Sequence, residues 1–83
     1  MKVSIRYFAA VREALGAGET LEVDPGATVA TVRARLIEVD AAHAAALNRG
    51  RALRSALNQV LCDEEARVVE GAEVGFFPPV TGG

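Results

Sequence analysis

The residues of this sequence with the clearest chemical potential are the two glycines at its end, Gly82 and Gly83. Glycine has no Cβ, so such a pair can pass through a narrow channel in another protein and leave its terminal carbonyl open to a nucleophile. A carboxylate is a poor electrophile, but once an adenylate is attached it can accept sulfur or an amine. The pair predicts a carrier whose working group is the Gly83 carboxylate, although a glycine pair by itself could also be merely a flexible end.

The four residues before the glycines, Pro78-Pro79-Val80-Thr81, are suited to a stiff spacer. Proline fixes φ at about −65° and favours an extended chain. Neither proline can donate a hydrogen bond to a neighbouring strand, so strand pairing must end before Pro78. We therefore expect a folded domain over residues 1–77 and an extended tail over 78–83. This spacer makes the glycine pair a more specific signal than it is alone.

The remaining reactive side chains carry weaker signals. His43 is the only histidine and Cys62 the only cysteine, and no ligand spacing predicts a metal site. We expect His43 on a solvated helix surface and interpret Cys62 as a structural thiol. The acidic residues 63–65 are interpreted as a solvated loop. These interpretations leave the terminal carboxylate as the candidate working group.

Four strands are predicted from alternating apolar residues. The first covers residues 2–8 and places Val3, Ile5 and Tyr7 on one face. The other three are expected at 20–23, 55–62 and 72–77. Turn chemistry separates them at Gly16-Ala17-Gly18, Asp24-Pro25-Gly26 and Glu70-Gly71.

Helical periodicity predicts the segments between the strands. The main helix is expected after an N-cap at Thr28. Its apolar stripe is formed by Val29, Val32, Leu36 and Val39. Shorter helices are expected at 9–15, ending at Gly16, and at 41–47, which is rich in alanine.

The order strand, strand, helix, strand, strand indicates an α+β domain in which one main helix packs across one face of a mixed sheet. Because the helix is a crossover between two hairpin-like halves, the first and last strands should lie side by side in the middle. This is the β-grasp, or ubiquitin-like, arrangement, with the C-terminal tail projecting from it. A chain of 83 residues holds at most one such domain.

Alternation along the strands also predicts an apolar face at the root of the tail. If the apolar residues of the first strand face the helix, Phe8 begins on the opposite face, and Phe77 is turned outward in the same way. Leu61 joins them if Val60 points inward. We expect Phe8, Leu61 and Phe77 to form an exposed patch of the kind that marks a protein interface, although twisted strand ends could instead place them in the core.

Composition excludes several classes of function. Hydrophobic residues make up 51% and charged residues 24% of the chain, which is typical of a folded globule. The net charge is -2 without a basic stripe, so nucleic acid is not an expected partner. The first residues alternate in polarity where a signal peptide needs a continuous apolar run, and no stretch approaches the ~20 apolar residues that span a bilayer. We expect a cytoplasmic protein with no membrane partner.

Several sequence motifs together resemble one known family. The ending FFPPVTGG at 76–83, preceded by EGAEV at 70–74, is similar to the small subunit of molybdopterin synthase, the MoaD family. The segments FAAVRE at 8–13 and ALNQ at 56–59 resemble its opening strand and helix and its third strand. The similarity covers nearly the whole chain. The segment Ala41–Gly50 departs most from the family pattern.

The resemblance implies a β-grasp fold and a cycle in which this chain is not an enzyme by itself and holds no permanent cofactor. An adenylating enzyme of the MoeB type would use ATP to convert the Gly83 carboxylate into an acyl-adenylate. A sulfur donor protein would convert the adenylate into a thiocarboxylate. The tail would then enter the large synthase subunit, MoaE, and deliver sulfur to precursor Z (cyclic pyranopterin monophosphate), forming molybdopterin.

Carried over residue by residue, the resemblance assigns Gly83 as the adenylated and thiocarboxylated residue and Gly82 as a steric gate. The contact residues would be Phe8, Leu61, Phe77 and the spacer residues 78–81. Catalytic acids and bases would belong to the partners, and the family implies a heterotetramer with MoaE.

Two alternatives share the fold and the terminal glycines. One is a sulfur carrier for thiamine or thiolated tRNA, which usually lacks the Phe-Pro-Pro-Val approach found at 77–80. The other is a ubiquitin-like modifier that forms isopeptide bonds with lysines of target proteins. Lys2 is the only lysine available for building chains, which weakens the second alternative.

Overall fold

The computed structural model describes residues 1–79, so the predictions for Val80, Thr81, Gly82 and Gly83 lie outside the described residues. In chain order the elements are β1 (Lys2–Tyr7), α1 (Ala9–Leu15), β2 (Gly18–Glu22), α2 (Val29–Ile37), α3 (Ala41–Leu47), β3 (Arg54–Leu57), β4 (Val60–Cys62) and β5 (Glu73–Phe77). Within residues 1–79, none of the helices has the length and apolar character needed to cross a membrane.

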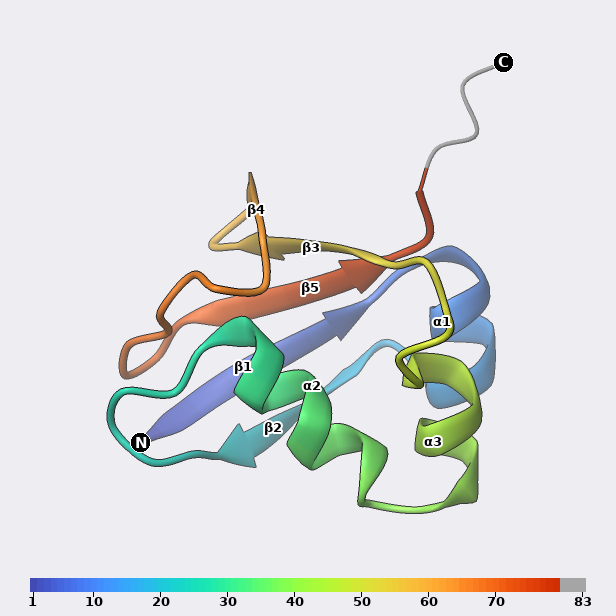
Figure 1. The fold of residues 1–83 in the computed structure, drawn as a ribbon, viewed down its shortest axis with the longest axis horizontal. Coiled ribbons are helices and arrows are strands. Elements are labelled where there is room, and N and C mark those ends of the chain that lie inside the picture. Colours follow the sequence, from blue (N-terminus) through green and yellow to red (C-terminus); the bar gives the residue numbers. More distant parts are fainter. Residues whose placement is uncertain (80–83) are drawn as a thin grey trace.

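The strands form one mixed sheet in the order β2-β1-β5-β3-β4. β1 and β5 are parallel neighbours in its middle, with Tyr7 opposite Phe76, and the other pairs are antiparallel. The three helices lie together on one side of the sheet (Figure 1). This topology confirms the predicted β-grasp fold and the central pairing of the first and last strands, with a fifth strand in addition to the four expected.

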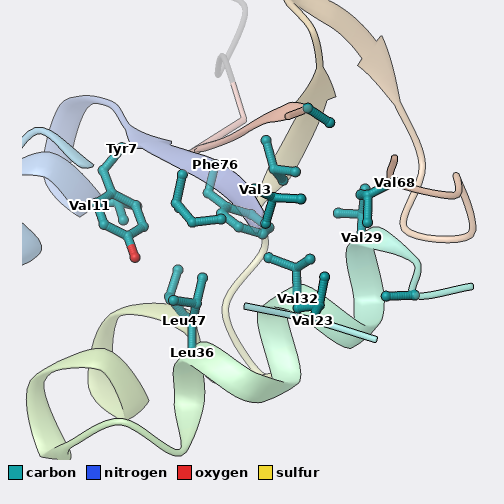
Figure 2. Packing of buried hydrophobic residues seen from close by; sticks show 14 residues of the cluster. Val3, Tyr7, Val11, Val23, Val29, Val32, Leu36, Leu47, Val68 and Phe76 are labelled. Carbon is teal, nitrogen blue, oxygen red and sulfur yellow. The ribbon is translucent and has the colours of Figure 1, made fainter. Parts of the chain in front are cut away.

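The hydrophobic core fills the space between the sheet and the helices. Side chains of β1 alternate between exposed and buried from Lys2 to Tyr7, which confirms the predicted inward face. Val32 and Leu36 of α2, Leu47 of α3 and Phe76 of β5 are fully buried, and side chains from the two layers point toward one another (Figure 2). Burying each such side chain contributes about 1.5–3 kcal/mol, so this layer supplies the main drive for folding.

The N-terminus of α2 confirms the predicted cap. Thr28 Oγ1 accepts a hydrogen bond from the Thr31 backbone N–H at 3.2 Å, and Thr31 Oγ1 accepts one from the Thr28 N–H at 3.1 Å. Two otherwise unpaired donors are satisfied by this reciprocal arrangement. The predicted apolar stripe is buried as far as Leu36, but Val39 is 50% exposed, because α2 ends at Ile37 and Val39 lies beyond it.

The single strand predicted at 55–62 is wrong. Two antiparallel strands, β3 and β4, occupy this segment, with Asn58 and Gln59 as the turn between them. Both turn residues have positive φ, at 50° and 69°, as the favoured two-residue hairpin requires. Asn58 also holds the turn to β5, because its N–H donates to the Glu73 carbonyl oxygen at 2.8 Å and its Oδ1 accepts from the Glu73 N–H at 2.9 Å.

Three other strands also differ at their boundaries from the prediction. β5 begins at Glu73 in place of Ala72. β1 ends at Tyr7 because Phe8 is the N-cap of α1. β2 covers Gly18–Glu22 in place of 20–23. A Cβ at its first residue would collide with the Ile5 carbonyl oxygen, so glycine permits the close approach of β1 and β2 at this point.

A buried arginine ties α2 to the C-terminal end of α3. Arg33 is 4% exposed and donates to the carbonyl oxygens of Leu47 at 2.7 Å, Asn48 at 2.6 Å and Arg51 at 3.0 Å. Its Nη1 pairs with Glu64 at 2.6 Å. The interpretation of the acidic run as simply solvated is therefore wrong for Glu64, which joins the loop to this arginine.

The structure also corrects one side-chain prediction and supports another. His43 is only 9% exposed, so its expected place on a solvated helix surface is wrong. It points from α3 toward the sheet, where its ring meets Tyr7 edge to face. Cys62 is a free, half-buried thiol that packs against the core, in agreement with a structural role.

Replacing Arg33 with Met is expected to lower the free energy of unfolding by about 3 kcal/mol or more, because three carbonyl oxygens lose their donor in a buried place. Arg49 is the matched control, since it pairs with the same Glu64 at 2.6 Å but its side chain is 57% exposed. Arg49→Met should cost less than about 1 kcal/mol. Urea unfolding followed by circular dichroism measures both changes, and equal effects would contradict the structural role of Arg33.

Candidate functional site

An apolar groove lies on the face of the sheet opposite the core. Its volume is about 590 Å³. The lining residues come from β1, β3, β4, β5 and the turns beside them: Arg6, Phe8, Ala56, Gln59, Leu61, Glu73, Gly75 and Phe77. The groove thus contains all three residues that alternation predicted for an exposed patch. The structure brings them together, and their contact with a partner stays a prediction.

Small residues form the floor of this groove. A Cβ at Gly75 would lie 3.1 Å from Phe8 Cε2 and 4.0 Å from the Ala56 Cβ, so the absence of a side chain lets the Phe8 ring lie across β5. The rings of Phe8 and Phe77 meet edge to face, with centroids 6.2 Å apart and an interplanar angle of 87°. Two aromatic rings are therefore fixed beside a floor of minimal side chains.

A polar rim borders the aromatic pair. The Arg6 guanidinium lies 5.8 Å from the centroid of the Phe8 ring, within range of a cation–π interaction. Arg6 Nη1 also pairs with Glu73 Oε2 at 3.7 Å. Arg6 and Glu73 both line the groove, and both side chains are partly exposed. Their charges therefore border the groove without being buried in it.

Sequence reasoning missed the floor and the rim, although their signal was present. Glu73, Gly75 and Phe77 lie two residues apart along β5, which places them on one face of the strand. A glycine between two such residues is the mark of a close approach by another group. Arg6 shares the outward face of β1 by the same rule.

The position of β4 requires one correction. The placement of Leu61 on the open face was argued from an inward-pointing Val60, but Val60 is 68% exposed and Leu61 is 61% exposed. β4 is a three-residue strand at the edge of the sheet, so it extends beyond the core and neither of these residues is buried. Leu61 reaches the groove while Val60 does not line it.

The tail begins at one end of the groove. β5 ends at Phe77, and the half-buried Pro78 and Pro79 follow it outside the ladder, as predicted. Pro78 lines a second hollow of about 200 Å³ on the helical side, formed with residues of α1, α3 and the segment 51–53. Phe77 therefore packs on the open face of the sheet and Pro78 on its helical face. These two contacts fix the chain just before the tail that carries the predicted chemistry.

The walls of this groove are mainly hydrocarbon, and Arg6, Gln59 and Glu73 are its polar members. Among residues 1–79, no three or more His, Cys, Asp or Glu side chains are grouped in a way that could hold a metal ion. The arrangement is suited to binding another protein through apolar and aromatic contacts surrounded by a charged rim.

Comparison with known proteins gives consistent results over the length of the chain. The model of the ThiS family matches residues 5–83. The chain is 40% identical over 81 residues to the molybdopterin synthase sulfur carrier subunit of Haemophilus influenzae and 37% identical over 81 residues to that of Escherichia coli. Each match covers 98% of this chain and 99% of the relative.

Solved structures share the fold. SAMP1 from Haloferax volcanii has a TM-score of 0.78 at 25% identity, with 100% of both chains covered. A chain in the complex of subunits 1 and 2 of the molybdopterin-converting factor from Helicobacter pylori 26695 has a TM-score of 0.71 at 25% identity, again with 100% of both chains covered. Both agree with the β-grasp topology described above.

The groove residues are expected to matter little for folding. Phe8 is 40% exposed and Phe76 is fully buried, so these two phenylalanines form a matched pair on opposite faces. Phe76→Ala should lower the free energy of unfolding by about 3–5 kcal/mol, whereas Phe8→Ala should lower it by about 1 kcal/mol, from its half-buried area and its aromatic contacts. Chemical unfolding measures both, and an equal loss would show that Phe8 serves the core.

Proposed function

The chain belongs to the ThiS family, and we propose that it is the sulfur carrier subunit of a molybdopterin synthase. The relatives that are similar over its whole length bear that name. The observation that carries the proposal is the groove that ends at Phe77, six residues before Gly83. A chain of this length spans at most roughly 20 Å, so a partner docked on the groove has its reactive centre within that reach.

The chemistry requires only one group from this chain. A carboxylate oxygen of Gly83 attacks the α-phosphate of ATP in an adenylating enzyme of the MoeB type, and pyrophosphate leaves. A sulfur nucleophile from a donor protein then attacks the acyl carbon of the adenylate, and AMP leaves. A persulfide donor is released when a second thiol attacks the donor's own sulfur and forms a disulfide with it, so the electron pair of the broken sulfur–sulfur bond stays on the carrier. The product is a thiocarboxylate, which is a stronger nucleophile than the original carboxylate and carries one sulfur atom.

Sulfur transfer takes place in a large subunit of the MoaE type. The thiocarboxylate sulfur attacks a carbon of precursor Z as a carbon–oxygen bond of precursor Z breaks, and water then cleaves the acyl–sulfur bond, which regenerates the Gly83 carboxylate and leaves one sulfur on the pterin. A second thiocarboxylated chain supplies the other sulfur of the dithiolene. Gly82 adds no side chain to the entrance, so it acts as the steric gate. Proton transfers belong to the large subunit, in keeping with the hydrocarbon character of the groove on this chain.

The groove supplies the affinity for these partners. Phe8, Leu61 and Phe77 are the apolar anchors, because aromatic and aliphatic groups at the centre of an interface carry most of its binding energy. Arg6 and Glu73 form the rim. Two subunits of the molybdopterin-converting factor form a complex in Helicobacter pylori, which supports a large-subunit partner for this chain. The heterotetramer that the family implies stays part of the proposal.

A protein-modifying role uses the same carboxylate and is the second candidate. It is favoured by the likeness to SAMP1, a structure of which is named small archaeal modifier protein 1. A modifier and a carrier share the adenylation step and differ in the nucleophile that follows, a lysine amine or a sulfur. The sulfur carriers of thiamine and tRNA synthesis differ only in the acceptor.

The first test follows the mass of the chain. After incubation with an adenylating enzyme, ATP and a sulfur source, the C-terminal peptide should gain the mass difference between sulfur and oxygen at Gly83. A chain with an alanine added after Gly83 is the control and should stay unchanged. Attachment of the chain to lysines of other proteins, with no sulfur gained, would reject the carrier role in favour of the modifier.

The second test separates the groove from the rest of the surface. Leu61 and Val69 are both 61% exposed, but only Leu61 lines the groove. Leu61→Asp should raise the dissociation constant for a MoaE-type subunit by about tenfold or more, the usual loss for a central anchor. Val69→Asp should leave it within about twofold. Calorimetry measures both constants, and equal weakening by the two variants would exclude the groove as the docking site.

A further inference from the structure

A cluster of titratable side chains lies on the core side of the sheet, away from the groove. Tyr7 of β1, Glu19 of β2 and His43 of α3 meet there, beside Asp40, the N-cap of α3. The Tyr7 hydroxyl donates to Glu19 Oε2 at 2.7 Å. His43 Nε2 lies 2.7 Å from the same oxygen, and His43 Nδ1 lies 2.8 Å from Asp40 Oδ1. In Figure 2 the Tyr7 hydroxyl points toward the helical layer, where α3 lies.

The geometry fixes the number of protons on the ring. Carboxylate oxygens only accept hydrogen bonds, so both nitrogens of His43 must donate to satisfy Glu19 and Asp40 together. A neutral imidazole has a single N–H and would turn one lone pair toward a carboxylate oxygen. The side chain of His43 is 11% exposed, so water has little room to replace the lost contact. The cluster is therefore complete only with the ring protonated.

The two ends of α3 are held by different cations. Arg33 binds the C-terminal end through the Leu47 and Asn48 carbonyl oxygens, and its guanidinium keeps its charge at every physiological pH. The N-terminal end is joined to β2 by His43, whose charge can be lost near neutral pH. A helix of seven residues is too short to persist by itself, so the buried Leu47 and these two attachments together hold it on the sheet.

We propose that Glu19, His43 and Asp40 form a proton-operated latch that fastens the N-terminal end of α3 to β2 when His43 is charged and releases it when the ring is neutral. The latch is independent of the proposed sulfur chemistry. Its ligand is a proton, and its effect is on the docking of α3 against the sheet.

The electrostatics of each member agree with this geometry. Burial lowers the pKa of His43, but the hydrogen bonds and charges of Glu19 and Asp40 outweigh burial, and the pKa is raised above its ordinary 6.5. Burial raises the pKa of Glu19, but the hydrogen bonds from His43 and Tyr7 outweigh it and the pKa is lowered. Backbone and ring hydrogen bonds from His43 lower the pKa of Asp40. Burial, followed by Glu19, raises the pKa of Tyr7, which stays a neutral donor.

The charged groups around the ring come from each element packed against α3. β2 supplies Glu19, β1 supplies the neutral Tyr7, and Asp40 lies at the start of α3. Arg33, the buried cation of α2, pairs with Glu64 and donates to backbone carbonyl oxygens. Arg12 and Glu13 of α1 are exposed. Within residues 1–79, the ring nitrogens form ion pairs with Glu19 and Asp40 alone.

These directions set the pH window of the latch. Since the folded pKa of His43 is raised, its stabilising effect is fully present below about pH 6.5 and is lost as pH rises through the folded value. Since the folded pKa values of Glu19 and Asp40 are lowered, their effect is lost only as pH falls through those lower values. The latch is therefore closed at and below about pH 6.5, down to the lowered pKa values of the two carboxylates, and it opens as pH rises through the raised pKa of His43.

A titration of the wild-type chain by NMR tests the proposal directly. His43 is the only histidine, so in a tag-free chain the imidazole signals need no assignment. We expect a midpoint above 6.5 and, below it, both ring nitrogens protonated. For each unit by which the pKa is raised, the folding equilibrium constant should fall about tenfold as pH rises across the titration. A midpoint at or below 6.5 would overturn the latch, whatever the variants do.

Variants separate the latch from general acid–base effects. His43→Gln and Glu19→Gln should each remove the loss of stability that accompanies the rise of pH through the pKa of His43. Over the same pH range, amide exchange in wild-type α3 should speed up beyond the intrinsic rate while exchange in α2 does not. Glu13→Gln, which removes an exposed carboxylate of α1, should keep the wild-type pH profile. A His43→Gln chain that loses the same amount of stability as wild type with rising pH would contradict the proposal.

Discussion

The parallel pairing of β1 with β5 is the constraint from which both faces of this molecule follow. Its register sets Tyr7 opposite Phe76, so the two ends of the described chain run side by side through the middle of the sheet. The residue that follows each of these, Phe8 at the N-cap of α1 and Phe77 at the end of β5, lines the groove on the open face, and their rings meet edge to face. The pairing thus places core residues on one face of the sheet and the residues that precede the tail on the other.

The two faces of the sheet have different roles: the helical face contributes stability, and the open face is the proposed binding surface. On the helical face, apolar burial is completed by two cationic attachments of α3, one through Arg33 and one through His43. On the open face, Gly75 keeps the floor low and Phe8 lies across it, at the expense of leaving large apolar groups exposed to water. Such an exposed apolar surface is typical of a protein interface, and a chain of the same fold belongs to the complex of subunits 1 and 2 of the molybdopterin-converting factor from Helicobacter pylori.

Much of this architecture could be predicted from periodicity, because alternation in β1 and β5 and the three-to-four spacing in α2 are strong local signals. The failures have specific causes. Arg33 lies within the apolar stripe of α2, at the fourth position after Val29, where a charged residue is normally read as solvent-facing. Its burial depends on carbonyl oxygens of residues 47–51, which no local pattern reveals.

His43 was misplaced for a similar reason, because its partner Glu19 is far from it in sequence. The Asn58-Gln59 turn lacked the usual glycine. Alternation places Phe8 and Phe77 on the open face, and it marks Arg6, Glu73 and Gly75 in the same way. That these residues form one groove with Leu61 depends on the order of the strands in the sheet, which alternation does not give.

Whether Gly83 delivers sulfur can be measured directly, without the adenylation step. A chain prepared semisynthetically with a thiocarboxylate at Gly83 is mixed with a MoaE-type subunit and precursor Z in the absence of ATP, and molybdopterin is quantified by its fluorescent oxidation product. We expect product in proportion to the thiocarboxylate supplied and none from the unmodified chain. Absence of product from the thiocarboxylated chain, or equal product from both chains, would contradict delivery of sulfur by Gly83.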